Sequence, residues 1–288
     1  MTANGMRKIG INFSKQGFAL SDEALMRLLR DVEFDSFFCG WNPDDHATDA
    51  LCELAARYGL AYESVHAPFR GISHIWEEGE KGDAYTAELK RVADSCHRFG
   101  IGYMTVHAAN APRFNNNGPH GSKYSQIGEE RFAEIAEYAG ERGVKIAIEN
   151  VEFPDREMLS LVRALEARGL EKGFATLFDV GHWYCYPCAL DFAECFGKYL
   201  IGTHVHDNFG NTDPQVITWD DDSHVLPFDG TIDYRRVGET LKRCEAPVSI
   251  TLELARTRNL LPWYADYTAE QFYATAAERA RHLAALCE

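Results

Sequence analysis

The chain has 288 residues, of which 45% are hydrophobic and 25% are charged, an ordinary composition for a soluble globular protein. Its formal net charge is −15 and it contains no Lys/Arg cluster, which argues against nonspecific binding to nucleic acid or to membranes. Because the N-terminus lacks the apolar core of a signal peptide and no apolar run reaches membrane-spanning length, we expect a cytoplasmic protein with no membrane partner.

Segments that resemble strands alternate along the chain with segments that resemble helices. Strands are predicted at residues 8–13, 34–41, 60–66, 103–109, 145–150, 174–180, 200–207 and 249–254. Helices are predicted from Ser21 onward and at residues 46–58, 84–99, 126–142, 156–168, 191–196, 234–244 and 268–286. Long loops are predicted at residues 67–82, 110–125 and 208–230, where turn-forming or acidic residues gather.

Eight strands that alternate with eight helices predict one fold in particular, a parallel (β/α)8 barrel or TIM barrel. We found no internal repeat or linker, so residues 1–288 are interpreted as a single α/β domain. A doubly wound open sheet is the alternative. It is disfavoured because no Gly-rich phosphate turn follows the first predicted strand.

The eight cysteines are scattered through a chain that is far longer than a disulfide-stapled module, so we predict reduced thiols. Cys185 and Cys188 form one isolated C-x-x-C pair with no second pair to complete a zinc site. The pattern favours ordinary core or loop thiols over a zinc or redox motif at this position.

Polar residues recur where the predicted strands end. In the run FATLFDVGHWY, residues 174–184, an apolar strand that is typical of a buried position breaks at Asp179 and His182. Similar residues at other strand ends or in the acidic loop are His66, His107, Glu149, His204, His206, Asp222, His224 and Glu253. In a barrel, the C-terminal ends of the strands converge on one mouth, where active sites are built.

A single histidine at a strand end is often only a structural residue, but ten such groups at one mouth require another explanation. Four or more buried acids would repel one another and take up protons unless cations lay among them. Imidazole combined with carboxylate suits zinc or manganese, with magnesium and cobalt as alternatives. We therefore predict a divalent metal centre at the mouth of the barrel.

The order of short motifs resembles that of the xylose isomerase-like barrels, a superfamily of sugar isomerases and epimerases that also contains the endonuclease IV branch. The motifs are HAPF at His66, TVH at His107, IEN at Glu149, DVGH at 179–182, HVHDN at 204–208, DSH at 222–224 and LEL at Glu253. The resemblance covers nearly the whole chain.

The resemblance implies that one metal is held by Glu149, Asp179, His204 and Glu253. His204 is assigned rather than His206 because the family's ligand lies three residues before an acidic position, here Asp207. From the endonuclease IV branch, the resemblance also implies further metal ligands at His66, His107, His182, Asp222 and His224.

Two functions follow from the resemblance. The first is a metal-dependent sugar isomerase or epimerase that moves a proton next to a carbonyl through an enediolate, with Glu149 and Glu253 as acid and base. Its predicted substrate contacts are His206, Trp41, Phe69, Trp76 and Trp183. The sequence does not specify which sugar is used, although the lack of an evident Lys/Arg phosphate grip near the last two strands favours an unphosphorylated one.

The alternative is an endonuclease IV-like phosphodiesterase that acts on abasic DNA, and the full set of ligand types supports it. The acidic stretch DPQVITWDDDS would repel a phosphate backbone, and the segment after His66 does not resemble that of the endonuclease. We therefore favour a small sugar or sugar-derived substrate over nucleic acid, and over a barrel that binds without catalysis. A homo-oligomer is compatible with this interpretation.

Overall fold

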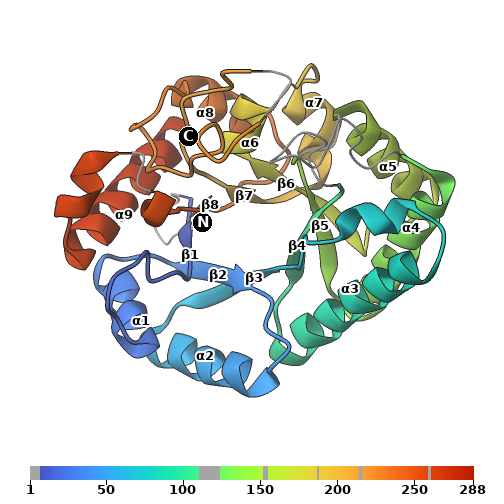
Figure 1. Ribbon diagram of the computed structural model, residues 1–288, viewed down its shortest axis with the longest axis horizontal. Coiled ribbons are helices and arrows are strands. Elements are labelled where there is room, and N and C mark those ends of the chain that lie inside the picture. The colour runs from blue at the N-terminus through green and yellow to red at the C-terminus, as the bar shows by residue number, and fades with distance from the viewer. Residues whose placement is uncertain (1–6, 110–123, 152–154, 187, 214–216, 259–260) are drawn as a thin grey trace.

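Eight parallel strands form one sheet that curves into a nearly closed barrel, with helices around its outside (Figure 1). The strands are β1 Ile9–Asn12, β2 Ser36–Gly40, β3 Ala61–His66, β4 Tyr103–His107, β5 Lys145–Glu149, β6 Phe174–Asp179, β7 Leu200–His204 and β8 Ile250–Leu252. This computed structural model describes residues 7–109, 124–151, 155–186, 188–213, 217–258 and 261–288. The predicted (β/α)8 barrel is confirmed; most of the predicted loop at 110–125 lies outside the described residues.

The barrel closes between the two strands at the ends of the sheet order β7-β6-β5-β4-β3-β2-β1-β8. Val205, which follows β7, forms a parallel bridge with Leu252 of β8. The Val205 amide donates to the Thr251 carbonyl at 2.9 Å, and the Glu253 amide donates to the Val205 carbonyl at 3.0 Å. These bonds bring the end of β8 beside the end of β7, so Glu253 lies near His204.

The helices are α1 Asp22–Asp31, α2 Asp45–Tyr58, α3 Glu80–Phe99, α4 Gln126–Glu141, α5 Asp155–Ala167, α6 Val180–Cys185, α7 Phe192–Phe196, α8 Tyr234–Lys242 and α9 Ala269–Leu286. Short 3-10 helices are η1 Ile72–Trp76, η3 Gly197–Tyr199, η4 Arg256–Arg258 and η5 Pro262–Asp266. Gly59 caps the C-terminus of α2 and Gly100 caps that of α3. Both glycines have a left-handed backbone conformation, with φ values of 70° and 69°.

Two local predictions differ from the structure. Residues 67–82 were expected to form a loop, but η1 lies within them and α3 begins at Glu80 rather than near residue 84. The short helix α6 was not predicted, because six residues carry little periodicity. Asp179 is the N-cap of α6, and its side chain accepts a hydrogen bond from the His182 amide at 2.6 Å.

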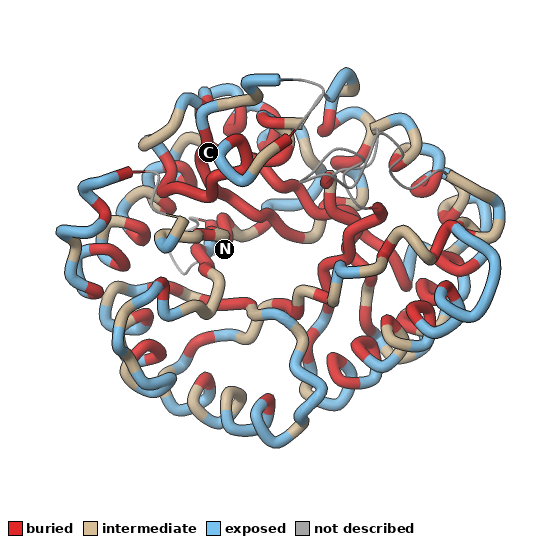
Figure 2. Tube along the Cα trace, viewed as in Figure 1, coloured by how far each residue is buried: buried red, intermediate tan, exposed pale blue. Residues whose placement is uncertain are grey.

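The buried residues follow the strands and the inward faces of the helices (Figure 2). Near the N-terminal ends of the strands, the Glu63 carboxylate fills the barrel interior and accepts hydrogen bonds from Ser36, Ser249 and Thr251 at 2.7, 2.7 and 2.9 Å. This hydrogen-bonded group lies at the end of the barrel opposite the predicted mouth. Of the helices in the described ranges, none has both the length and the apolar character needed to cross a membrane.

Candidate metal centre

Neighbouring strands end in register at the mouth of the barrel. His107 of β4 pairs with Glu149 of β5, and Asp179 of β6 pairs with His204 of β7. Because these residues are at the same level on adjacent parallel strands, their side chains meet in a small volume. The barrel topology therefore gathers the predicted ligands into three overlapping groups.

The first group contains Glu149, Asp179, His204 and Glu253, with one ligand atom from each lying within 4.8 Å of the others. His204 Nδ1 lies 3.0 Å from Glu149 Oε1 and 3.4 Å from Glu253 Oε2. Around tetrahedral zinc, with bonds of ~2.0–2.2 Å, ligand atoms are separated by ~3.3–3.6 Å. The spacing and the mixture of imidazole and carboxylate therefore fit a divalent cation.

The second group shares Glu149 with the first. His107 Nε2 lies 3.2 Å from His66 Nε2 and 3.2 Å from Glu149 Oε2, and His66 Nε2 lies 3.6 Å from the same oxygen. The two oxygens of Glu149 thus face different groups, Oε1 toward His204 and Oε2 toward His66 and His107. This is the arrangement expected of a carboxylate that bridges two cations.

The third group brings three imidazoles to Asp222. Its Oδ1 atom lies 3.5 Å from His182 Nε2, 3.6 Å from His206 Nε2 and 3.2 Å from His224 Nε2. The rings of His206 and His224 are stacked at 3.6 Å with an interplanar angle of 6°, so one cation would not lie in the plane of both rings. A cation bound by His182 and Asp222 would therefore take only one of these two stacked rings as a well-oriented ligand.

His206, predicted as a substrate contact, is fully buried and belongs to this third group instead. Its ring lies directly against Gly181, where an added Cβ would be only 1.9 Å from His206 Cε1. Both ring nitrogens lack a hydrogen-bond partner among the described residues. We remove His206 from the substrate contacts, because the ring presents no exposed surface to a ligand.

Many buried polar atoms at the mouth have no hydrogen-bond partner among the described residues. They include Glu149 Oε2, Asp179 Oδ2, His182 Nδ1, His204 Nε2 and Asp222 Oδ1. Leaving a buried polar atom unpaired costs about 1–3 kcal/mol. Their concentration in one place, together with the ligand types, is what a metal centre requires.

The ionisation of the metal-free cluster follows from its mixed charges. Burial lowers the pKa of His204, but Glu253 and Glu149 outweigh that effect and raise it to about 9. Burial raises the pKa of Glu253, yet the imidazoles of His204 and His224 bring it down to about 2. Without a cation, protonated histidines therefore compensate the carboxylates.

Two cavities, of about 460 and 140 Å³, meet over the candidate metal centre and share His66, Phe69 and Glu253 in their walls. Together we call them the cleft. Trp41 lines the larger cavity, and the exposed ring of Phe69 stacks on His107 with the ring centroids 4.9 Å apart. Trp41 and Phe69 thus line the cleft over the candidate metal centre and remain predicted substrate contacts.

Trp76 and Trp183 lie elsewhere than the sequence interpretation placed them. Trp76 is buried in η1, packs against Phe132 and donates from Nε1 to the Ala108 carbonyl at 2.7 Å. Trp183 follows His182 on α6, so its side chain leaves the helix in another direction and packs against Phe178. Neither ring lines the cleft cavities, and we remove both from the substrate contacts.

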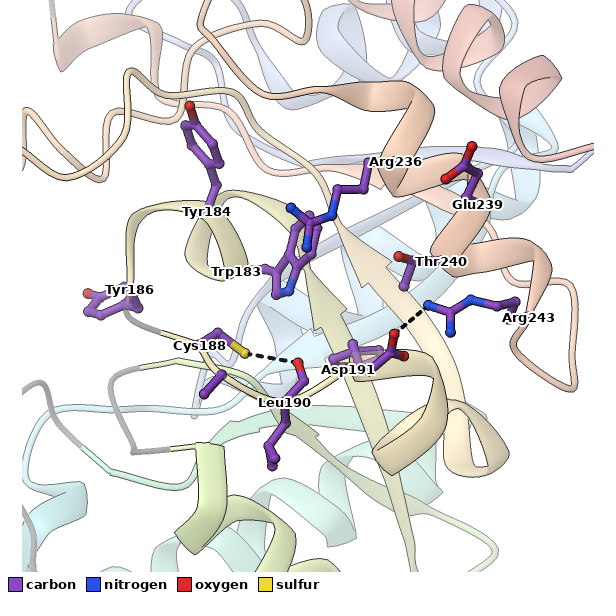
Figure 3. A pocket seen from close by; sticks show the side chains of 12 residues that line it. Trp183, Tyr184, Tyr186, Cys188, Leu190, Asp191, Arg236, Glu239, Thr240 and Arg243 are labelled. Atoms are coloured by element: carbon purple, nitrogen blue, oxygen red, sulfur yellow. Dashed lines mark hydrogen bonds and ion pairs between the residues drawn. The ribbon is translucent and has the colours of Figure 1, made fainter.

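Trp183 instead lines a separate cavity of about 680 Å³ formed by the chain around α6, α7 and α8 (Figure 3). The Arg236 guanidinium lies 4.9 Å from the centre of the Trp183 ring. Arg243 and Asp191 form an ion pair at 2.8 Å across another wall (Figure 3). This cavity contains none of the predicted metal ligands.

Arg258 and Trp219 line the smaller cavity of the cleft and were not identified from the sequence. The Arg258 guanidinium lies 4.4 Å from the centre of the Trp219 ring and donates to the Asp222 carbonyl. The signal was present as the ARTR run just after β8, but nothing local indicates which of its arginines turns toward the mouth.

Asp207 anchors the long loop that carries Asp222 and His224 to the mouth. Its buried carboxylate accepts hydrogen bonds from the amides of Asn208, Phe228 and Ile232 at 2.8, 2.9 and 3.2 Å. A carboxylate accepts all three, whereas an amide side chain would place a donor against one of these N–H groups.

We therefore expect Asp207→Asn to lower the free energy of unfolding by about 1–3 kcal/mol in urea denaturation. The matched control is Asp233→Asn, at the exposed N-cap of α8, where asparagine caps a helix as well as aspartate does. Equal losses in the two variants would contradict the anchoring role of Asp207.

The fold and the site define a class: a (β/α)8 barrel with a histidine- and carboxylate-lined candidate metal centre at its mouth. The profile of the Xylose isomerase-like TIM barrel family matches residues 26–286, and the chain belongs to this family. The resemblance inferred from the motifs is thereby confirmed.

Known proteins similar to this chain include one sequence relative and several solved structures. Uncharacterized protein y4fM of Sinorhizobium fredii is 24% identical, and the match covers 88% of this chain and 90% of that protein. D-Psicose 3-epimerase from Clostridium cellulolyticum H10, solved with D-tagatose, superposes with a TM-score of 0.74 at 12% identity, covering 98% and 99% of the chains. The zinc-bound IOLI protein has a TM-score of 0.74 at 18% identity, covering 96% and 98%.

Proposed function

We propose that this protein is a divalent-metal-dependent isomerase or epimerase that moves a proton next to the carbonyl group of a sugar or sugar derivative. The observation that carries the proposal is the position of Glu253, which belongs to the first ligand group and also lines both cavities of the cleft. One carboxylate is thus close to the candidate cation and accessible to a small substrate.

Glu149, Asp179, His204 and Glu253 would hold the cation, with zinc or manganese as the favoured ions. A divalent cation held there would polarise a carbonyl oxygen and offset the negative charge that develops when the adjacent carbon loses its proton.

The two catalytic carboxylates occupy unequal positions. The Glu253 side chain is 20% exposed and ionised, so it can take a proton from a substrate carbon in the cleft and return it, by way of an enediolate. Glu149 is fully buried between two ligand groups. We therefore assign the first proton transfer to Glu253 and keep Glu149 as its proposed partner in epimerisation, where a proton must return from the other face.

A sugar or sugar derivative is proposed as the substrate because of the aromatic side chains in the cleft and the similarity in fold to sugar epimerases. Trp41 and Phe69 offer aromatic surface at the entrance of the cleft, which suits the apolar face of a sugar ring or chain. Proteins with this fold include D-psicose 3-epimerase and L-ribulose 3-epimerase, the latter superposing with a TM-score of 0.67 at 15% identity.

A second candidate function is metal-dependent phosphodiester cleavage of the endonuclease IV kind. It is favoured by one observation, the three overlapping ligand groups, because clustered cations suit hydrolysis of phosphate esters. Against it, the loop that supplies Asp222 also carries Asp220 and Asp221, so a nucleic-acid backbone would meet like charge.

The test that separates the two functions uses the metal-loaded protein. A panel of ketoses is incubated in heavy water, and in parallel an abasic DNA duplex is offered under the same conditions. We expect deuterium to enter the carbon next to the carbonyl of at least one ketose, and a chelator to abolish this exchange. Cleavage of the duplex without any deuterium incorporation would instead establish the phosphodiesterase.

A further inference from the structure

Arg258 differs from the other partly buried arginines near the barrel mouth in how little of its hydrogen-bonding capacity is used. Arg256, on the same 3-10 helix, donates to the carbonyls of Gln16 and Tyr264. Arg279 donates to the Pro227 carbonyl and pairs with Asp229 at 2.7 Å. By contrast, within the described ranges the Arg258 guanidinium makes one hydrogen bond, from Nη1 to the Asp222 carbonyl. Its Nε and Nη2 groups remain available to a ligand in the cleft.

The guanidinium is also held in place before any ligand arrives. It lies over the Trp219 ring at 4.4 Å, and its Nη1 is fixed by the Asp222 carbonyl. The side chain is 24% exposed and lines the smaller cavity together with Glu253. A preorganised donor loses less conformational entropy on binding than a free surface arginine.

Among the described residues, the positive charge of Arg258 has one ion-pair partner, and that partner is shared. The carboxylate oxygen with which it pairs is Asp222 Oδ2, at 3.9 Å, the outer limit for an ion pair. The other oxygen, Oδ1, faces the histidines of the third ligand group. Asp222 therefore serves the candidate metal centre first, and the guanidinium second.

With cations bound, the floor of the cleft would not repel an anion. Glu149, Asp179, Asp222 and Glu253 carry four negative charges, which two divalent cations would neutralise and three would exceed. Arg258 then makes this side of the cleft positive, although the chain as a whole has a net charge of −15. An anionic group of the substrate would be attracted to this side.

We infer that the substrate carries an oxyanion group, a phosphate ester or a carboxylate, that Arg258 binds at the rim of the cleft. The inference rests on the proposed function and sharpens it, because it specifies an anionic substrate where the sequence favoured only an unphosphorylated one. The planar guanidinium group binds either oxyanion through two parallel hydrogen bonds. Its hydrogen bonds to a neutral hydroxyl group would be weaker.

The first experiment measures binding of inorganic phosphate and of acetate to the metal-loaded protein by calorimetry at fixed ionic strength. We expect Arg258→Gln to weaken binding of at least one of these anions by about tenfold or more, the effect of losing a charge-assisted hydrogen bond. Direct binding of anions to the cations is common to both proteins, so the difference isolates the arginine. The control is Arg243→Gln, whose exposed ion pair lies in the separate cavity of Figure 3.

Arg258→Lys is a second variant, to be used if the glutamine variant loses metal or folds poorly. Lysine retains the positive charge and a hydrogen-bond donor for the Asp222 carbonyl. We expect it to bind phosphate more weakly than the wild type, because the planar guanidinium group is lost. Unchanged affinity for both anions in the arginine variants that retain metal would overturn the inference.

The exchange assay separates failure of this inference from failure of the proposed function. Arg258→Gln should raise KM for anionic ketoses about tenfold more than it raises KM for neutral ketoses. Exchange confined to neutral ketoses, with no dependence on Arg258, would refute the inference and leave the function standing. Arginine-dependent anion binding without exchange in any sugar would refute the function and leave the inference standing.

Discussion

We expect Glu253→Gln to reduce solvent-proton exchange at the carbon next to the substrate carbonyl by about a hundredfold to ten-thousandfold, and to leave the barrel folded. This range is the usual contribution of a positioned general base. The carboxamide has nearly the same shape and still binds a cation weakly, but it does not accept a proton at neutral pH. Since the Glu253 side chain is partly exposed in the cleft, its replacement removes no core packing.

The control for this prediction is Glu239→Gln, an exposed glutamate of α8 in the wall of the separate cavity. Metal content and the circular dichroism spectrum of both variants show whether the fold and the ligand groups persist. A Glu253→Gln protein that retains metal and exchanges protons at the wild-type rate would rule out Glu253 as the base. Glu149→Gln, in contrast, should lose bound metal as well as exchange, because Glu149 belongs to two ligand groups.

We expect removal of the proposed cations to destabilise the protein, and the difference in stability between the loaded and metal-free forms to widen as the pH rises from about 6.5 to 9. In the metal-free protein the pKa of His204 is raised to about 9, against an ordinary value of about 6.5. A raised histidine pKa stabilises the fold fully below the unfolded value, and this contribution is lost as the pH rises through the folded value. For His204, the contribution is on the order of 3 kcal/mol.

The stability of the loaded form should change in the opposite direction over the same pH range. His204 must be neutral to bind a cation, so protons compete with the metal below pH 9 and the apparent affinity increases as the pH rises. His182 adds to the effect, because Asp179 and Asp222 raise its pKa well above the ordinary value although burial opposes them.

The measurement is the free energy of unfolding in urea at pH 6.5, 7.5 and 8.5, for protein treated with a chelator and for protein reloaded with zinc. His204→Gln should flatten the pH dependence of the metal-free form, whereas His46→Gln, at an exposed position on α2, should leave it unchanged. A gap between the two forms that is constant with pH would show that His204 is neutral in the metal-free protein.

Several features at the mouth could be predicted from local sequence because barrel topology leaves them little choice. Glu149, Asp179 and His204 end three successive strands, and the C-terminal ends of parallel barrel strands meet at one mouth. The helix ends at Gly59 and Gly100 were equally predictable, because a left-handed residue closes both helices.

Positions outside the strands were less predictable, since their side-chain directions depend on contacts far away in the sequence. Asp179 was expected as a strand-end ligand, but it is also the N-cap of α6. This short helix directs His182 toward the candidate metal centre and Trp183 away from it, against Phe178. Trp76 was interpreted as a wall of the site, yet a hydrogen bond to the Ala108 carbonyl holds it in the core.

The sequence by itself determined the barrel, the residue types of the candidate metal centre and their gathering at one mouth, because strand periodicity and strand order are encoded locally. Only the tertiary structure decided that His206 is buried beside Gly181 and that Arg258 turns into the cleft. Each of these depends on how a side chain packs against partners dozens of residues away, and no local pattern records that packing.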